Sequence, residues 1–231
     1  MATQHLATAH AGFVVRDMIQ AIVAQRQYLS EVDGAIGDGD HGVNMSKGFA
    51  QCRDKLDRIE STEPAVSLVK ALDELTETLL DGIGGSMGPL YGTFFMSFAD
   101  EIRQDTALDR ENFGRALHAA IEGVQMVGDA KRGDKTLMDT LLPAYDRYSE
   151  ALAANASFSA CLQALSEGAA EGMESTRALQ ARIGRASRLG ARSIGVLDAG
   201  ACSCCFILQS IAQSVSRTLE SEQHGAAAKA V

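Results

Sequence analysis

Apolar residues recur every three or four positions along most of the chain, which is the spacing of helices with one buried face. In the first such stretch Phe13, Ile19, Ile22, Val23 and Leu29 form a broad stripe. No strand-like alternation or β-hairpin turn interrupts this pattern. It predicts eight helices, over residues 5–30, 42–58, 63–81, 88–104, 110–127, 135–153, 157–181 and 199–220.

Short connections between eight helices predict an all-α fold, an eight-helix antiparallel barrel or bundle. Residues 61–64 read as a helix start, with a cap candidate before a proline, and Pro89 marks another. Pro143 lies inside a periodic run, where it should kink or break the helix. Neither a low-complexity linker nor a repeat divides the chain, so residues 1–231 are expected to form one domain.

Composition narrows the functional classes. The formal net charge is −9, so an acidic surface should repel nucleic acid, and any anionic ligand must meet locally concentrated cations. No apolar run appears long enough to span a membrane, and residues 1–11 do not resemble a signal peptide. Five cysteines, an odd number, fit free thiols in the cytoplasm. Cys202, Cys204 and Cys205 lack zinc-finger spacing and are expected in the core.

Four connections carry glycine together with reactive polar residues: 33–44, 82–88, 128–136 and 184–200. Turns between helices do not require such residues, so a site at one end of the bundle is expected. In the first, Asp33, Asp38 and Asp40 would repel one another unless a cation neutralised them, and their oxygens suit Mg²⁺. A solvated acidic turn is the alternative. An EF-hand is excluded because Phe49 stands where its glutamate would be. His41 is open to three roles: metal ligand, phosphate contact, favoured here, or packing.

The other three connections are less specific. Residues 82–89 lead into a helix whose amides attract phosphate, but they fail the dinucleotide fingerprint. Residues 128–136 resemble a P-loop with Asp134 inserted before Lys135, and Asp134 reads instead as a helix cap. Five arginines indicate phosphate capture, docking on an acidic partner, or a solvated basic face. They are Arg177, Arg182, Arg185, Arg188 and Arg192.

Five segments occur in one order that resembles the L subunit of dihydroxyacetone kinases, over about residues 10–215. They are 35–42 (AIGDGDHG), 88–95 (GPLYGTFF), 133–136 (GDKT), 184–187 (GRAS) and 192–195 (RSIG). The resemblance implies an eight-helix barrel that binds ADP or ATP at one end through magnesium, with two ions expected. It also implies that a separate K subunit holds the ketone covalently on a histidine, so this chain should lack the substrate-binding residue.

The resemblance assigns residues to roles. The implied magnesium ligands are Asp33, Asp38 and Asp40, and Arg185 is expected to act on the transferred phosphoryl group or dock the K subunit. The implied nucleotide contacts are His41, Gly42, Val43, Asn44, Ser86, Met87, Gly128, Leu137, Arg185, Asp198, Ala199 and Gly200. The chain departs from the family where Ser86-Met87 replaces Ala-Ser, and where Ala199 replaces a proline.

Two kinase modes remain open. Bound ADP can be a resident cofactor recharged by a phosphotransferase-system protein, the mode favoured here, or ATP can exchange freely in a kinase for dihydroxyacetone or an erythrulose-like ketose. A third reading is a nucleotide-binding regulatory module that contacts a transcription factor. No membrane or nucleic-acid partner is expected.

Overall fold

Helices dominate the fold, which confirms the all-α class. The computed structural model describes residues 4–63 and 65–229, with side chains described through Ser221. This part of the chain contains nine α-helices: α1 Phe13–Ala24, α2 Arg26–Ile36, α3 His41–Glu60, α4 Leu68–Gly82, α5 Met87–Glu101, α6 Arg110–Val127, α7 Met138–Ala153, α8 Phe158–Ser175 and α9 Ala199–Lys229.

Shorter elements complete the description. Three are 3₁₀ helices: η1 Thr8–His10, η2 Thr176–Ala178 and η3 Arg185–Ser193. Two strands of two residues each, β1 Leu6–Ala7 and β2 Ala107–Leu108, pair antiparallel with Leu6 opposite Leu108. The sequence did not predict this pair, because two residues are too few to establish an alternating pattern.

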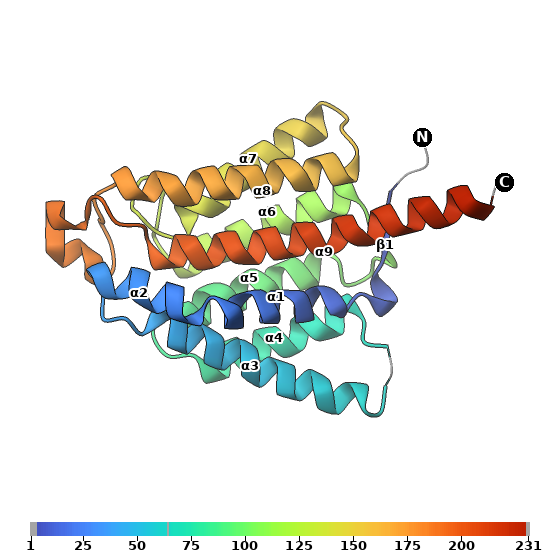
Figure 1. The fold of residues 1–231 in the computed structure, drawn as a ribbon, viewed down its shortest axis with the longest axis horizontal. Helices are drawn as coiled ribbons and strands as arrows, with labels where there is room; N and C mark the ends of the chain where they lie inside the picture. The colour runs from blue at the N-terminus through green and yellow to red at the C-terminus, as the bar shows by residue number, and fades with distance from the viewer. Residues whose placement is uncertain (1–3, 64, 230–231) are drawn as a thin grey trace.

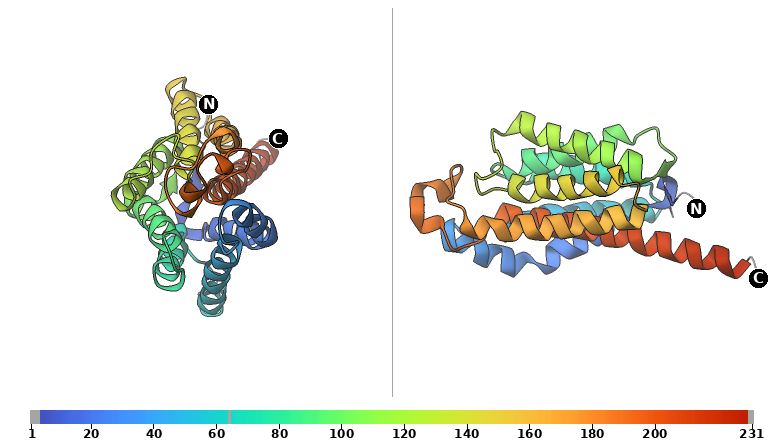
Figure 2. Two further views of the ribbon diagram at one scale, coloured as in Figure 1. Left: turned by 90° about the vertical axis from the view of Figure 1, so that its left-hand side faces the viewer. Right: turned by 90° about the horizontal axis from the view of Figure 1, so that it is seen from above.

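The helices close into a ring. Going round it, α1 packs against α3, each helix from α3 to α9 packs against the next, and α9 returns to α1. The view along the bundle shows this ring, with α2 continuing beyond α1 at one end (Figure 2). The eight-helix barrel is therefore confirmed, and the ninth helix arises because the first predicted stretch divides in two at Gln25.

Two predicted helix features are wrong. Helix α4 begins after Ser67, whose hydroxyl accepts a hydrogen bond from the Lys70 amide at 3.1 Å, and not at residues 61–64; Pro64 itself lies outside the described residues. Helix α7 continues through Pro143, so the predicted break is wrong. Pro143 has no N–H to donate to the carbonyl of Asp139, and that carbonyl instead faces Gly172 of α8, where a Cβ would collide with it. The bare glycine backbone thus lets the neighbouring helix cover the exposed acceptor.

The interior of the ring is filled by aromatic and aliphatic side chains from every ring helix. Phe113 of α6 is fully buried, and its ring lies 5.5 Å from that of Phe98, 5.2 Å from Tyr148 and 5.7 Å from Phe158, centroid to centroid. These contacts join α5, α6, α7 and α8. The centre of the bundle is a packed core, so the polar chemistry is confined to its ends.

Helix α9 supplies much of this core. Its stretch Ala199–Ser221 has a mean hydropathy of 1.2 and is long and apolar enough to cross a membrane, contrary to the sequence-based expectation. In the fold, 67% of this apolar stretch is buried inside the protein. Cys202, Cys204 and Cys205 lie on this helix as buried free thiols, which confirms the prediction that they are core residues.

Alternate connections of an antiparallel ring lie at the same end. Residues 37–40, 83–86, 128–137 and 176–198 therefore gather at one end of the bundle, at the left of Figure 1. The other three connections, at 61–67, 102–109 and 154–157, lie at the opposite end. All four connections that are rich in glycine and reactive polar residues thus share one end, as the sequence predicts.

Candidate functional site

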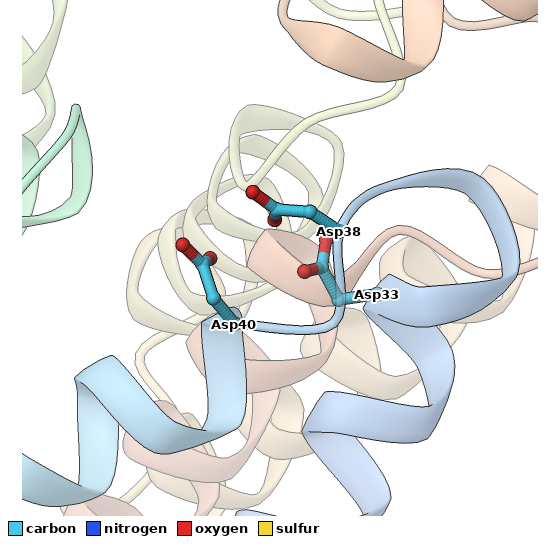
Figure 3. A group of neighbouring side chains, drawn as sticks. All are labelled: Asp33, Asp38 and Asp40. Carbon is cyan, nitrogen blue, oxygen red and sulfur yellow. The ribbon is translucent and has the colours of Figure 1, made fainter.

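The acidic turn between α2 and α3 brings three carboxylates together. Asp33 lies in the last turn of α2, Asp38 in the connection, and Asp40 directly before α3. One oxygen from each lies within 4.8 Å of the others, and the side chains project to the same side of the turn (Figure 3). Asp33 is held in place because its Oδ2 accepts a hydrogen bond from the His41 amide at 3.3 Å.

A glycine sets the spacing of the two helices that carry these carboxylates. A Cβ at Gly42 would overlap the carbonyl of Arg26 and lie 2.6 Å from Ser30 Oγ. The first turn of α3 therefore presses directly on the backbone of α2. Only glycine permits this approach, and it packs the start of α3 against the first half of α2, about one turn before Asp33.

A second segment reaches the acidic turn from far along the chain. We call residues 176–196, which run from η2 through η3, the arginine arm. Nη1 of Arg185 contacts Asp38 and lies 3.8 Å from Asp40 Oδ2. The predicted metal ligands and the predicted catalytic arginine are therefore neighbours, although 145 residues separate Asp40 from Arg185. The guanidinium supplies positive charge where the three carboxylates converge.

The His41 side chain is packed inside the fold, while its contact with a phosphate stays a prediction. Its ring is buried, and Nε2 lies 2.9 Å from Ser203 Oγ of α9. Ser203 Oγ lies 2.6 Å from the hydroxyl of Tyr91, which donates to the carbonyl of Gly200 at 3.1 Å. Nothing in the local sequence indicates that Ser203 and Tyr91 take part in the site. This polar chain ties α3, α5 and the start of α9 together beneath the acidic turn.

Burial lowers the pKa of His41 to about 4, and Asp33 opposes the shift. In the unfolded chain His41 has an ordinary pKa near 6.5, so as pH falls the unfolded state binds a proton before the folded state does. The free energy of unfolding therefore decreases between pH about 6.5 and about 4. The loss amounts to about 3 kcal/mol. In His41→Gln the side chain at this position does not titrate. Without metal or nucleotide, the free energy of unfolding of this variant should therefore fall by about 3 kcal/mol less than that of the native chain between these two pH values, as measured by denaturant unfolding. Burial raises the pKa of Asp198 to about 6, which acts in the opposite direction in both proteins and so cancels in the comparison. Equal pH slopes for the two proteins would contradict the prediction.

The start of α5 and the end of α6 lie at the same end of the bundle as the acidic turn. Ser86 is exposed, whereas the Met87 side chain packs against the core, so Ser86 is the residue of the pair that offers a hydroxyl to a ligand. Gly128 ends α6, and a Cβ there would lie 3.3 Å from Leu90 of α5. The two predicted contact segments 86–87 and 128 thus lie close together.

The start of α9 meets the start of α7. A Cβ at Gly200 would lie 3.0 Å from Asp198 Oδ2 and 3.6 Å from the amide of Leu137. Asp198 accepts a hydrogen bond from the Ala201 amide at 2.8 Å and donates its own amide to Thr176 Oγ1 at 3.1 Å. Ala199 is buried. Asp198 therefore caps the N-terminus of α9, and the turn that it forms lies beside Leu137, another predicted nucleotide contact.

The segment that resembles a P-loop has a different role. Asp134 does not cap α7: its carboxylate accepts from the Lys131 amide at 2.8 Å. Asp139, inside α7, instead accepts from the amides of Gly133 at 2.5 Å and Thr136 at 2.9 Å. Lys135 is buried and donates to backbone carbonyls, so its ammonium group faces no phosphate. These contacts are consistent with the prediction that the segment is not a P-loop. The sequence did not indicate the role of Lys135.

The arrangement provides what phosphoryl transfer requires of a protein. Carboxylates can hold a divalent cation, the exposed amides of a helix start can face a phosphate, and a guanidinium stands beside both. Val43 and Asn44, in the first turn of α3, lie at the rim of this end, with the Val43 side chain exposed. No covalent nucleophile is needed, because positioning and charge neutralisation dominate such reactions.

A protein-family model described as the DAK2 domain matches residues 35–213. The ADP-binding subunit DhaL of the PEP-dependent dihydroxyacetone kinase of Escherichia coli (strain K12) is 37% identical over 188 residues, which is 81% of this chain and 88% of that protein. The ADP-binding subunit DhaL of PEP-dependent dihydroxyacetone kinase 2 of Listeria innocua serovar 6a is 35% identical, over 92% of this chain and 97% of that protein.

The same fold occurs in a longer solved protein. The native form of the dihydroxyacetone kinase of C. freundii aligns with a TM-score of 0.66 at 22% identity, covering 93% of this chain but 36% of that one. The agreement in fold, the family match over most of the residues and two relatives above 30% identity lead to one conclusion: this chain belongs to the DAK2-domain family of phosphotransferases, alongside the ADP-binding subunits of dihydroxyacetone kinases.

Proposed function

We propose that this chain is the nucleotide-carrying L subunit of a dihydroxyacetone kinase, which passes a phosphoryl group from bound nucleotide to dihydroxyacetone held on a separate K subunit. The observation that carries the proposal is the meeting of Asp33, Asp38 and Asp40 with Arg185 at one end of a helical ring. The E. coli and Listeria relatives, named ADP-binding subunits, match this chain over nearly their whole length, which supports the assignment.

The three carboxylates are the proposed holders of magnesium, and two ions are proposed. Their oxygens are the donors that Mg²⁺ prefers, and the ion supplies charge neutralisation and orientation of the phosphates when it is bound. The chain's own contribution is placement. The amides of Gly42 and Val43 begin α3 beside the cluster, and helix starts attract phosphate. The Asn44 amide already donates to the Asp40 carbonyl at 2.9 Å, so the side chain of Asn44 is its proposed contact.

The remaining contacts are proposed for the rest of the nucleotide. Ser86, Met87 and Gly128 lie on one side of this end, while Leu137, Asp198, Ala199 and Gly200 lie on the other. Arg185 is the proposed catalytic residue. A planar guanidinium next to the phosphate-binding region can stabilise the charge that develops on the transferring group.

ADP is the proposed resident cofactor, recharged in place by a phosphotransferase-system protein. Two relatives of similar length are named PEP-dependent, which supports this mode over free exchange of ATP. We further propose a cytoplasmic location, because all five cysteines are buried free thiols, as suits a reducing compartment.

The decisive experiment is a reconstituted kinase assay. The chain with its cognate K subunit should phosphorylate dihydroxyacetone from phosphoenolpyruvate plus carrier proteins, and omission of the K subunit should abolish turnover because that subunit is the proposed holder of the ketone. ADP should survive purification and dialysis. Turnover with ATP but not with phosphoenolpyruvate would replace the resident-cofactor mode, and a robust rate without K subunit would refute the division of labour.

A further inference from the structure

Lys135 lies in a cage of backbone carbonyls. Its side chain is 2% exposed, and Nζ donates to the carbonyls of Thr176 at 2.7 Å, Ser193 at 2.8 Å and Leu179 at 3.2 Å, and also to that of Val196. An ammonium group has three hydrogens, so these four acceptors use its whole capacity. No donor capacity remains for a ligand.

The four carbonyls come from the two ends of the arginine arm. Thr176 and Leu179 belong to the outgoing end, and Ser193 and Val196 to the returning end. Lys135 stands outside the arm, in the connection before α7. One ammonium group therefore joins both ends of a loop of about twenty residues and anchors them to the bundle.

Two further contacts close the base of the arm. The Gly195 amide donates to the Arg177 carbonyl at 2.8 Å, and the Ala181 amide donates to Ser193 Oγ at 2.9 Å. Beyond this base the segment carrying Arg185 is exposed. Outside the base, the outer part is held by the Arg182 amide, which donates to the Asp134 carbonyl at 3.1 Å, and by packing of η3 on α2. Because these contacts are few, the order of the outer part depends strongly on closure of the base.

The backbone at Lys135 shows that this contact is maintained at a cost. Among the described residues only Lys135 (φ 62°) and Asn155 (φ 57°) have a positive φ without being glycine. Asparagine adopts this conformation fairly readily, whereas lysine does so rarely. Burial also lowers the pKa of Lys135. A long apolar side chain would fill the same space without desolvating a charge, so the ammonium group is the part that the cage requires.

We propose that Lys135 is a positioning residue that clasps the two ends of the arginine arm and thereby holds Arg185 against the acidic turn. The catalytic consequence rests on the function proposed above for Arg185, whereas the clasp itself does not. The chemistry that the cage recognises is a primary ammonium ion, donating to carbonyl oxygens.

The first test measures the order of the arm without reference to catalysis. Trypsin cuts after arginine, so cleavage at Arg182, Arg185 and Arg188, followed by mass spectrometry, reports how often the arm opens. Lys135→Gly relieves the positive φ and vacates the cage, and it should speed cleavage at least about 10-fold. The control is Lys55→Met, a half-buried lysine on α3 that pairs with Glu77, and this variant should be cleaved at the native rate.

Chemical rescue separates the clasp from general damage to the fold. Added n-butylammonium, which replaces the missing stem and donor, should restore protection to Lys135→Gly, whereas tetramethylammonium, which has no N–H, should not. Native protection in Lys135→Gly, or equal effects of the two ions, would overturn the clasp, even if the chain proves to be a kinase subunit.

The second test is a double-mutant cycle on turnover with the K subunit, using Lys135→Gly, Arg185→Ala and both together. If Lys135 acts through Arg185, the double variant should be no more than about 2-fold slower than Arg185→Ala alone, because the two losses share one cause. Losses that multiply would overturn the positioning role. If no K subunit supports turnover even with the native chain, the proposed function fails, and the cleavage and rescue results still decide the clasp.

Discussion

Asp38→Ala should weaken Mg²⁺-dependent binding of ADP at least about 100-fold, because it removes one of the three carboxylates proposed as ligands of the cation. The side chain is about half exposed, so no core space is vacated. Stability without ligand should change by less than about 1 kcal/mol, the worth of an exposed ion pair with Arg185. Isothermal calorimetry with and without magnesium measures the affinity, and denaturant unfolding measures the stability.

Asp54→Ala is the matched control. Asp54 is an exposed carboxylate on α3, the helix that follows Asp40, and it forms an ion pair with the neighbouring Arg53. Its removal should leave magnesium-dependent binding unchanged. An unaltered ADP affinity in Asp38→Ala would remove the metal assignment, and a helical content lower than native would show that the variant reports on folding.

Arg185→Lys should lower turnover with the K subunit at least about 100-fold while ADP affinity changes less than about 3-fold. Lysine keeps the positive charge but loses the planar fork that faces Asp38 and Asp40. Steady-state kinetics, ADP calorimetry and K-subunit affinity, all on this one variant, separate catalysis from ground-state binding.

Arg188→Lys provides the control within the same arm, since Arg188 is exposed and its loss should alter none of the three quantities. A defect of Arg185→Lys confined to K-subunit affinity would indicate docking and not phosphoryl transfer. Native behaviour in all three measurements would place Arg185 on a solvated basic face.

Apolar spacing was enough to predict the helices but not all their ends. The break at Gln25 has no proline or glycine to announce it, and both sides of it have helical composition. Ser61 and Ser67 are equally good caps locally. The choice of Ser67 follows from burial of Leu68, Ala71 and Leu72 in the ring, which is a tertiary effect.

The site, too, was only partly predictable from local sequence. The acidic turn was predictable because its three carboxylates lie within eight positions. The return of Arg185 to that turn depends on Lys135, whose bonding partners lie 41 to 61 residues away. Local sequence made Lys135 look like part of an imperfect P-loop. The partner of the His41 side chain was unpredictable for a similar reason, since Ser203 lies on the last helix.

The closed ring has a consequence for how the protein acquires its activity. Most neighbours in the ring are also neighbours in sequence, so these contacts have a low contact order and can form early. The contact of α9 with α1 is the exception, and it joins the two ends of the described chain. Asp33, Asp38 and Asp40 belong to the first part and Arg185 and Asp198 to the last, so the complete site exists only after this closure. A ligand that bridges both parts would therefore favour the closed ring over every partly assembled form, and nucleotide would act as a thermodynamic check on complete folding.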